Sequence, residues 1–201
     1  MTSTMKLIID ELRENYKGFS DDKLIRIATT DVSGLRSEAI QALKEEIKSR
    51  GLSDGLIDGI QVQTKGISDD ELLAYCELLR RRVCPVCNSS STKLNATLTA
   101  TVVSYIIITS SEEKLVVACP NCLDKANMDA NIKTALFGWW GFPLGIYRTI
   151  KALLHNRKMK SQTRLAEPND YFKGFVIGQI GTIEANKTNN DRLQLLVKNL
   201  N

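Results

Sequence analysis

Cys84-Pro85-Val86-Cys87 is the first of two copies of one short cysteine pattern, and Cys119-Pro120-Asn121-Cys122 is the second. Within each copy two residues separate the thiols, so one tight turn can aim both sulfurs at a single ion. Two such turns supply the four corners of a tetrahedron. The sequence therefore predicts one metal site in the middle of the chain, with four thiolate ligands: Cys84, Cys87, Cys119 and Cys122.

The predicted ligand set favours one structural Zn²⁺. Thiolate sulfur suits zinc or iron, and tetrahedral four-sulfur sites hold either metal. Rubredoxin-type iron sites usually carry a glycine after the second cysteine of each pair, where this chain has Asn88 and Leu123. Asparagine tolerates a left-handed backbone and leucine does so poorly, which favours zinc over iron. Four sulfur ligands leave no open position for water or substrate, so the site is expected to hold the fold together and not to catalyse a reaction.

The residues between the two cysteine pairs predict a β hairpin. Apolar residues alternate with polar ones from Lys93 to Val102, and an apolar run rich in isoleucine follows at 105–108. Period-two alternation with many β-branched residues is typical of strands. We expect a polar turn at 110–113 and a return strand over 115–118 that leads directly into the second cysteine pair. This order of elements is typical of a zinc ribbon.

Helices are expected on both sides of this hairpin. Ser20, and Ser68 with Glu71, have the spacing of helix N-caps, and Gly51 stands where a helix C-terminus favours glycine. The predicted fold class is therefore α+β, with a helical N-terminal region, a small antiparallel zinc-ribbon β hairpin and C-terminal helices. We expect four parts: a helical region (1–82), the zinc ribbon (83–125), an aromatic and basic helical segment (126–166) and C-terminal helices (167–201).

An aromatic stretch, Gly138-Trp139-Trp140-Gly141-Phe142-Pro143-Leu144-Gly145, follows the predicted ribbon. Its glycines and proline exclude one continuous helix, so we expect one helix before Gly138 and a second from about residue 144 to 155. Only 14 residues separate Lys133 from Arg148, whereas a membrane-spanning helix needs about 20 apolar residues. Because tryptophan and tyrosine favour the headgroup zone of a bilayer, the stretch is suited to lie on a membrane. A core position for both tryptophans, packed against the ribbon, is the alternative.

The net charge of +4 conceals a strongly cationic segment. Residues 130–166 contain seven basic residues and no acidic one, and the rest of the chain sums to −3. A local excess of this kind indicates an anionic partner, such as a lipid surface, a nucleic acid or an acidic protein, and a solvated helix face is the alternative. The predicted partner-binding or membrane-binding residues are Trp139, Trp140, Phe142, Arg148, Lys151, Arg157, Lys158 and Lys160.

The N-terminus and the rest of the composition predict a cytoplasmic protein without a catalytic site. Asp10 and Glu11 stand where a signal peptide would be apolar, and an odd number of cysteines suits a reducing compartment. We expect the protein in the cytoplasm, at the inner membrane face where it docks. The single histidine, His155, is expected at the surface near a helix C-terminus. Because nucleophile elbows, phosphate-cradling glycine loops and His–Asp pairs are absent from the sequence, we predict no catalytic residues and no small-molecule substrate.

Two resemblances bear on the region from Cys84 to Lys198. It resembles uncharacterised bacterial zinc-ribbon proteins in which a C-P-x-C…C-P-x-C pair is followed by a G-W-W-G-x-P-x-G segment, here residues 138–145. Leu144 stands where such sequences often have tryptophan. The region is more weakly similar to the LITAF-type domain, in which an apolar membrane-inserting helix lies between the zinc knuckles, whereas here the tryptophans follow them. The resemblances imply a zinc ribbon and imply no activity.

These patterns together predict a non-catalytic zinc-binding module that docks on an anionic membrane surface or a protein partner through its tryptophan and basic segment. A nucleic-acid-binding zinc ribbon is the alternative. Arg80, Arg81 and Arg82 abut the first cysteine pair and could neutralise phosphates, and exposed aromatic rings can stack on unpaired bases. The predicted strands carry few basic residues, which disfavours this alternative.

Overall fold

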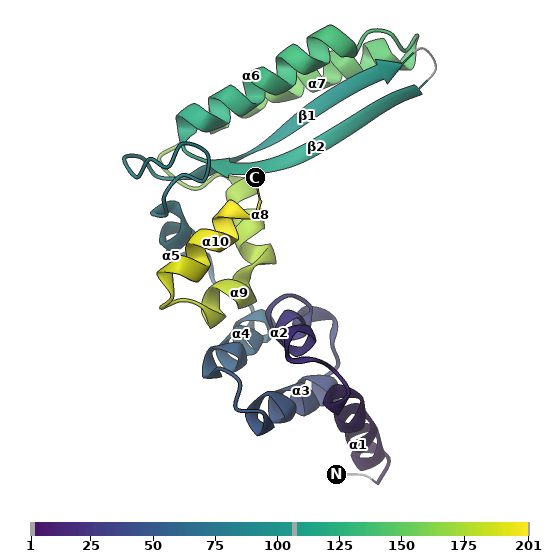
Figure 1. Ribbon diagram of the computed structural model, residues 1–201, viewed down its shortest axis with the longest axis vertical. Helices are drawn as coiled ribbons and strands as arrows, with labels where there is room; N and C mark the ends of the chain where they lie inside the picture. Colours follow the sequence, from purple (N-terminus) through teal and green to yellow (C-terminus); the bar gives the residue numbers. More distant parts are fainter. Residues whose placement is uncertain (1–2, 106–107, 201) are drawn as a thin grey trace. The chain divides into compact units, whose positions relative to one another are not determined.

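The computed structural model describes residues 3–105 and 108–200 and forms two compact units (Figure 1). Unit 1 comprises Met1–Tyr75 and Val176–Asn190, and unit 2 comprises Cys76–Phe175 and Asp191–Asn201. All three boundaries fall inside helices: α5 (Asp69–Arg80), α8 (Asp170–Gly178) and, after its first residue, α10 (Asn190–Lys198). The described residues form helices and one two-stranded antiparallel β hairpin, which confirms the α+β class.

Unit 1 is built of short helices that begin and end at the signals found in the sequence. The Ser20 hydroxyl accepts a hydrogen bond from the backbone N–H of Lys23, and Ser68 and Glu71 form the predicted capping box. Gly51 has a φ of +64°, which is the left-handed conformation of a helix C-terminus. The helices are α1 (Ser3–Lys17), α2 (Asp21–Thr30), the 3₁₀ turn η1 (Val32–Gly34), α3 (Ser37–Ser49), α4 (Asp54–Lys65), the first part of α5, and α9 (Ile180–Ala185).

Two helices of unit 1, α4 and α9, approach each other through residues without bulky side chains. A Cβ atom added at Gly59 would lie 2.7 Å from the carbonyl oxygen of Gly181, and one added at Gly55 would lie 2.6 Å from the carbonyl oxygen of Ala185. Both distances are shorter than real Cβ contacts, so only glycine allows this packing. The core beside it is aliphatic and fully buried, with Leu24, Ala28, Val32, Leu43, Ile47 and Ile60.

Unit 2 is organised around a long hairpin, β1 (Asn95–Tyr105) and β2 (Ile108–Ala118). The register pairs Asn95 with Ala118 and Tyr105 with Ile108, so the connection lies at 106–107, outside the described residues. The predicted turn at 110–113 is therefore wrong, because these residues pair with 100–103 inside β2. Their polar side chains are exposed in β2, since the helices of this unit cover β1 instead, and a polar run is tolerated in such a strand.

Two helices, α6 (Pro120–Phe137) and α7 (Leu144–Gln162), pack along β1 and contact β2 at few places (Figure 1). The predicted break between them is confirmed at residues 138–143, and α7 continues beyond the predicted end at 155 to Gln162. No described helix is long and apolar enough to cross a membrane. We call β1, β2, α6 and α7 together the finger, and its end near Tyr105, Ile108 and residues 138–144 the tip.

Side chains of α6 and α7 form hydrogen bonds with the backbone of β1 along the edge that faces away from β2. Asn156 accepts from the backbone N–H of Ala100 and donates to the Ala100 carbonyl, both at 2.8 Å. The hydroxyl of Thr134 accepts from the N–H of Val102 at 3.1 Å. His155 donates from Nε2 to the Leu98 carbonyl at 2.8 Å, so the expectation of a surface histidine at a helix end is wrong. An edge strand closed in this way has few groups left for pairing with another chain.

The base of the finger is tied to neighbouring segments of unit 2. The amide side chain of Gln194, on α10 (Asn190–Lys198), donates to the Val83 carbonyl and accepts from the Val83 N–H, both at 2.9 Å. Arg80 is 3% exposed, and its guanidinium donates to the Leu94 carbonyl at 2.9 Å and to Glu77 at 2.8 Å. These bonds fix the chain on both sides of the first cysteine pair.

Candidate metal centre

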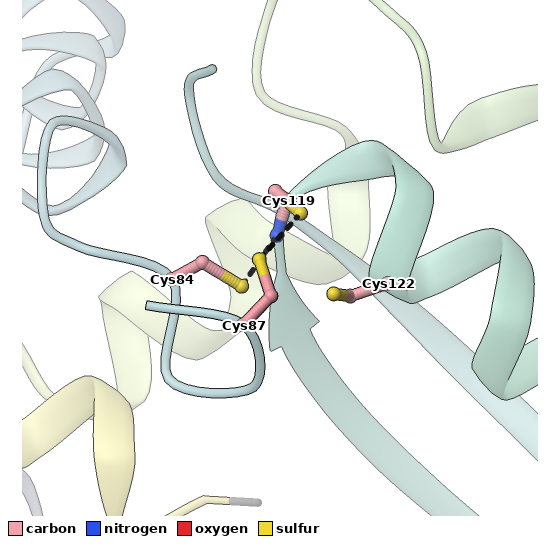
Figure 2. A group of neighbouring side chains, drawn as sticks. All are labelled: Cys84, Cys87, Cys119 and Cys122. Atoms are coloured by element: carbon pink, nitrogen blue, oxygen red, sulfur yellow. Dashed lines mark hydrogen bonds between the residues drawn. The ribbon is translucent and has the colours of Figure 1, made fainter. Parts of the chain in front are cut away.

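The four cysteines of the two pairs converge at the base of the finger (Figure 2). All four sulfur atoms lie within 4.8 Å of one another, and those of Cys87 and Cys119 are 3.6 Å apart. A tetrahedral zinc site with Zn–S bonds of about 2.3 Å has sulfur–sulfur edges of about 3.8 Å. All five cysteines of the chain are free, and the sulfurs are too far apart for disulfides. Soft donors at these separations fit one tetrahedrally bound ion.

The first pair lies on a tight loop that follows α5. The N–H of Asn88 donates to the Cys84 carbonyl at 2.9 Å, and the N–H of Cys84 donates to the Ser89 carbonyl at 2.9 Å. Asn88 has a φ of +57°, the left-handed conformation that asparagine tolerates. This turn aims the Cys84 and Cys87 side chains at the same point (Figure 2).

The second pair lies at the start of a helix and not on a second tight turn. Cys119 is the N-cap of α6, Pro120 is its first residue, and Cys122 follows within the first turn. The N–H of Leu123 donates to the Cys119 carbonyl at 3.0 Å, so Leu123 is helical. Proline has no N–H that would need a partner at the first helical position, and its ring presets the helical φ. Pro120 therefore explains why a helix begins directly after Cys119. The positive end of the helix dipole also favours thiolates at these two positions.

Burial and hydrogen bonding set different proton affinities at the four sulfurs. Burial raises the pKa of the Cys84 thiol, but backbone N–H groups of Cys119, Cys87 and Val86 that point at its sulfur more than offset this and lower the pKa to about 7. The N–H of Cys119 lies 3.4 Å from that sulfur. Burial raises the pKa of Cys119 and Cys122. A bound divalent cation supplies the opposite charge that keeps all four as thiolates.

The arrangement can hold a metal ion and join three segments of the chain. The sulfurs come from the loop after α5, the end of β2 and the first turn of α6. Four protein ligands complete a tetrahedron, so substrate would have no coordination position. Within the described residues this is the one group of three or more cysteine, histidine or carboxylate side chains with metal-ligand spacing.

The predicted aromatic contact residues are exposed at the tip of the finger. Trp139, Trp140 and Phe142 are 42%, 70% and 83% exposed, so a core position for the tryptophans is excluded. The indole N–H of Trp139 donates to the Ala135 carbonyl at 2.7 Å, which satisfies its polar atom within the protein. The predicted basic residues all lie exposed on α7, where they are Arg148, Lys151, Arg157, Lys158 and Lys160.

The structure adds apolar residues that the sequence reasoning missed. Tyr105 and Ile108, at the strand ends, are 70% and 68% exposed. Met128, Ile132 and Leu136, on α6, are also exposed. The signal for the α6 residues was their spacing of four, which places them on one helix face. Periodicity alone, however, cannot say whether such a face is covered.

The arginines beside the first cysteine pair are not arranged as a phosphate-binding cluster. Arg80 is buried with its guanidinium engaged, as described above. Arg81 is exposed, and its Nε lies 3.9 Å from a carboxylate oxygen of Glu77. Burial of Arg80 therefore removes one of the three arginines on which the nucleic-acid alternative rested.

Comparison with known proteins found no matching family model, no matching curated protein and no matching solved structure.

Proposed function

We propose that the protein is a non-catalytic metal-binding module, in which a closed four-thiolate Zn²⁺ centre holds the base of the finger and the aromatic tip docks on an anionic membrane surface. The convergence of Cys84, Cys87, Cys119 and Cys122 carries the first half of this proposal. The exposure of Trp140 and its neighbours at the opposite end of the finger supports the second half.

Zinc is the metal that this centre suits best. It accepts four sulfur ligands in a tetrahedron, and it needs no particular electronic geometry or redox partner. The two halves of the centre differ, because Asn88 is left-handed and Leu123 is helical. A rubredoxin-type iron site would favour two similar turns, each with a left-handed residue after the second cysteine. The observed asymmetry supports zinc over iron.

The metal half of the proposal is tested by removing one ligand. Cys122→Ser should lower the bound zinc from one ion per chain, measured by mass spectrometry of the freshly purified reduced protein, and should expose the β1 amides to hydrogen exchange. Cys76→Ser is the matched control, because Cys76 is free and buried outside the cluster. Equal zinc content in both variants, or none in the parent protein, would contradict the proposal.

Exposure of large apolar side chains at the tip favours a bilayer as the docking partner. Phe142, Leu144 and Tyr147 are each more than 60% exposed and lie with the tryptophans in one short segment. Rings of this kind bury in the headgroup and upper acyl region, while nearby cations contact anionic headgroups. Near such a surface each basic residue contributes about 1 kcal/mol, so three of them contribute a factor of roughly 100 in affinity.

Vesicle sedimentation tests the docking half. We expect the protein to sediment with vesicles of phosphatidylcholine and phosphatidylglycerol, and less with phosphatidylcholine alone. Trp140→Ala with Phe142→Ala should abolish most binding, and Arg157→Gln with Lys158→Gln should weaken binding to the anionic vesicles by a factor of roughly 30. Leu195→Ala is the control, because Leu195 is 47% exposed on α10, outside the finger.

Three results would redirect the docking proposal. Binding that is equal in the tip variant and the control would exclude the tip as the membrane contact. Absence of vesicle binding, together with salt-dependent retention on single-stranded DNA or RNA, would favour the nucleic-acid alternative. Capture of a protein partner that depends on Trp140 and not on lipid would favour a protein surface instead.

A further inference from the structure

The outer face of the α6–α7 pair carries two exposed apolar rows. On α6 the residues that pack toward β1 are Leu123, Asn127, Ala130 and Thr134. On the opposite side of that helix, Met128, Ile132 and Leu136 are 54%, 50% and 61% exposed. On α7, Ile150 and Leu154 are 47% and 63% exposed and continue from Tyr147 at the tip. Most of the large apolar side chains that are exposed in the described part of the chain lie on the finger.

Cations flank these rows. Lys133 is the neighbour of Ile132, Lys151 is the neighbour of Ile150, and both are exposed. Arg157 and Lys158 extend the α7 row toward the base of the finger, and both are exposed too. Asp129, beside Met128, is the acidic residue of this face, and Asp124 further along α6 is paired with Arg164. An apolar stripe bordered by lysine and arginine is complementary to an anionic bilayer surface.

The other side of the finger is polar. β2 lies beyond β1 from the two helices (Figure 1) and exposes Ser110, Ser111, Glu112 and Glu113. In the described residues the sheet has two strands, so no third strand pairs with β2, and the Thr109 carbonyl accepts a hydrogen bond from Arg148 of α7 at 3.0 Å. Open sheet edges and carboxylates are not found in the hydrocarbon region of a bilayer.

From this asymmetry we infer that the finger lies flat, with the outer face of α6 and α7 in the plane of an anionic bilayer surface and β2 facing water. The inference rests on the proposed docking function and adds the orientation and the wider contact surface. The α7 part of the surface, from Leu144 to Leu154, is about 15 Å long at the helical rise of 1.5 Å per residue. An upright finger would place Ser110, Ser111 and the open β2 edge in lipid, whereas a flat finger keeps them hydrated.

Affinity measurements on outer-face variants test this orientation. Ile132→Gln with Leu154→Gln keeps the tip intact and removes one side chain from each row. Each apolar side chain that leaves water on docking contributes about tenfold in affinity, so the double variant should bind anionic vesicles roughly 100-fold more weakly. Leu195→Gln, on α10, should bind as the parent protein does. Circular dichroism and zinc content should be unchanged, because the replaced side chains are exposed.

Fluorescence quenching gives a second, independent readout. In a protein with Trp139→Phe and Trp140→Phe, a single reporter is introduced as Ile132→Trp or as Ser111→Trp. Brominated lipids should quench the reporter at residue 132 strongly and the reporter at residue 111 weakly. Equal quenching of the two reporters would overturn the flat orientation.

The outcomes separate the inference from the proposed function. If the parent protein does not bind vesicles, the docking function fails and the inference fails with it. If the tip variant loses binding and the outer-face variant retains it, docking stands and the flat orientation is refuted. If the outer-face variant changes only the oligomeric state of the protein in solution, the face contacts a second copy of the chain and the inference is also refuted.

Discussion

Asn156→Leu should destabilise the finger because Asn156 closes the free edge of β1. The side chain is fully buried, and its amide satisfies both backbone groups of Ala100. Leucine has nearly the same size but no polar atoms, so it would leave one buried N–H and one buried carbonyl without partners. Each unsatisfied group costs about 1–3 kcal/mol, and the added apolar contacts of leucine offset part of this. The expected loss is about 3 kcal/mol.

Hydrogen exchange measures this loss locally and does not require that the two units unfold together. The loss of about 3 kcal/mol corresponds to a roughly 100-fold faster exchange of the Ala100 amide and its neighbours in β1, with unit 1 unchanged. Asn131→Leu is the matched control, because the Asn131 side chain accepts a hydrogen bond from Asn156 at 3.0 Å and, within the described residues, none from the β1 backbone. It should change β1 exchange by less than about tenfold. Protection of Ala100 that survives Asn156→Leu to within a few-fold would refute the edge-closing role.

Three other predictions concern the rest of the fold. Arg80→Met should lower the free energy of unfolding by about 2–3 kcal/mol, because the Leu94 carbonyl loses its buried hydrogen-bond donor. Hydrogen exchange near Leu94 should become faster, and unchanged exchange would contradict this role. Gly59→Ala should lower the stability of unit 1 by about 1–3 kcal/mol, because the added Cβ would lie 2.7 Å from the Gly181 carbonyl oxygen. The thermal midpoint measured by circular dichroism should fall, and an equal or higher midpoint would show that α4 and α9 can move apart. Burial raises the pKa of Cys76 to about 11, so its thiol should resist iodoacetamide at pH 8 in the folded protein and react after denaturation; rapid labelling of the native protein would contradict the burial.

The sequence was sufficient for features that depend on local chemistry. Ser20, Ser68 and Gly51 mark helix ends because their caps are made with residues a few positions away. The α+β class and the break at Gly138 follow from periodicity and from glycine and proline, which act within one or two turns. The clustering of four cysteines was predictable as well, since two C-P-x-C pairs around a hairpin bring their thiols to one end.

Features that depend on long-range packing were not predictable from the sequence. The turn was expected at 110–113 because that segment is polar, but α6 and α7 cover β1 and leave β2 free to carry polar residues. His155 was expected at the surface because nothing local shows that Leu98 needs a hydrogen-bond donor. The helical spacing of Ile132 and Leu136 is equally typical of a buried helix face. Only the packing of α6 in the finger shows that these side chains are exposed.

X-ray absorption at the metal edge of the purified, zinc-loaded protein tests the central claim most directly, because it counts the ligands and measures their distances. The four converging thiols predict one zinc ion per chain with four sulfur neighbours at about 2.3 Å and no nitrogen or oxygen neighbour. A spectrum that requires an oxygen or nitrogen ligand, or fewer than four sulfurs, would contradict the closed thiolate centre.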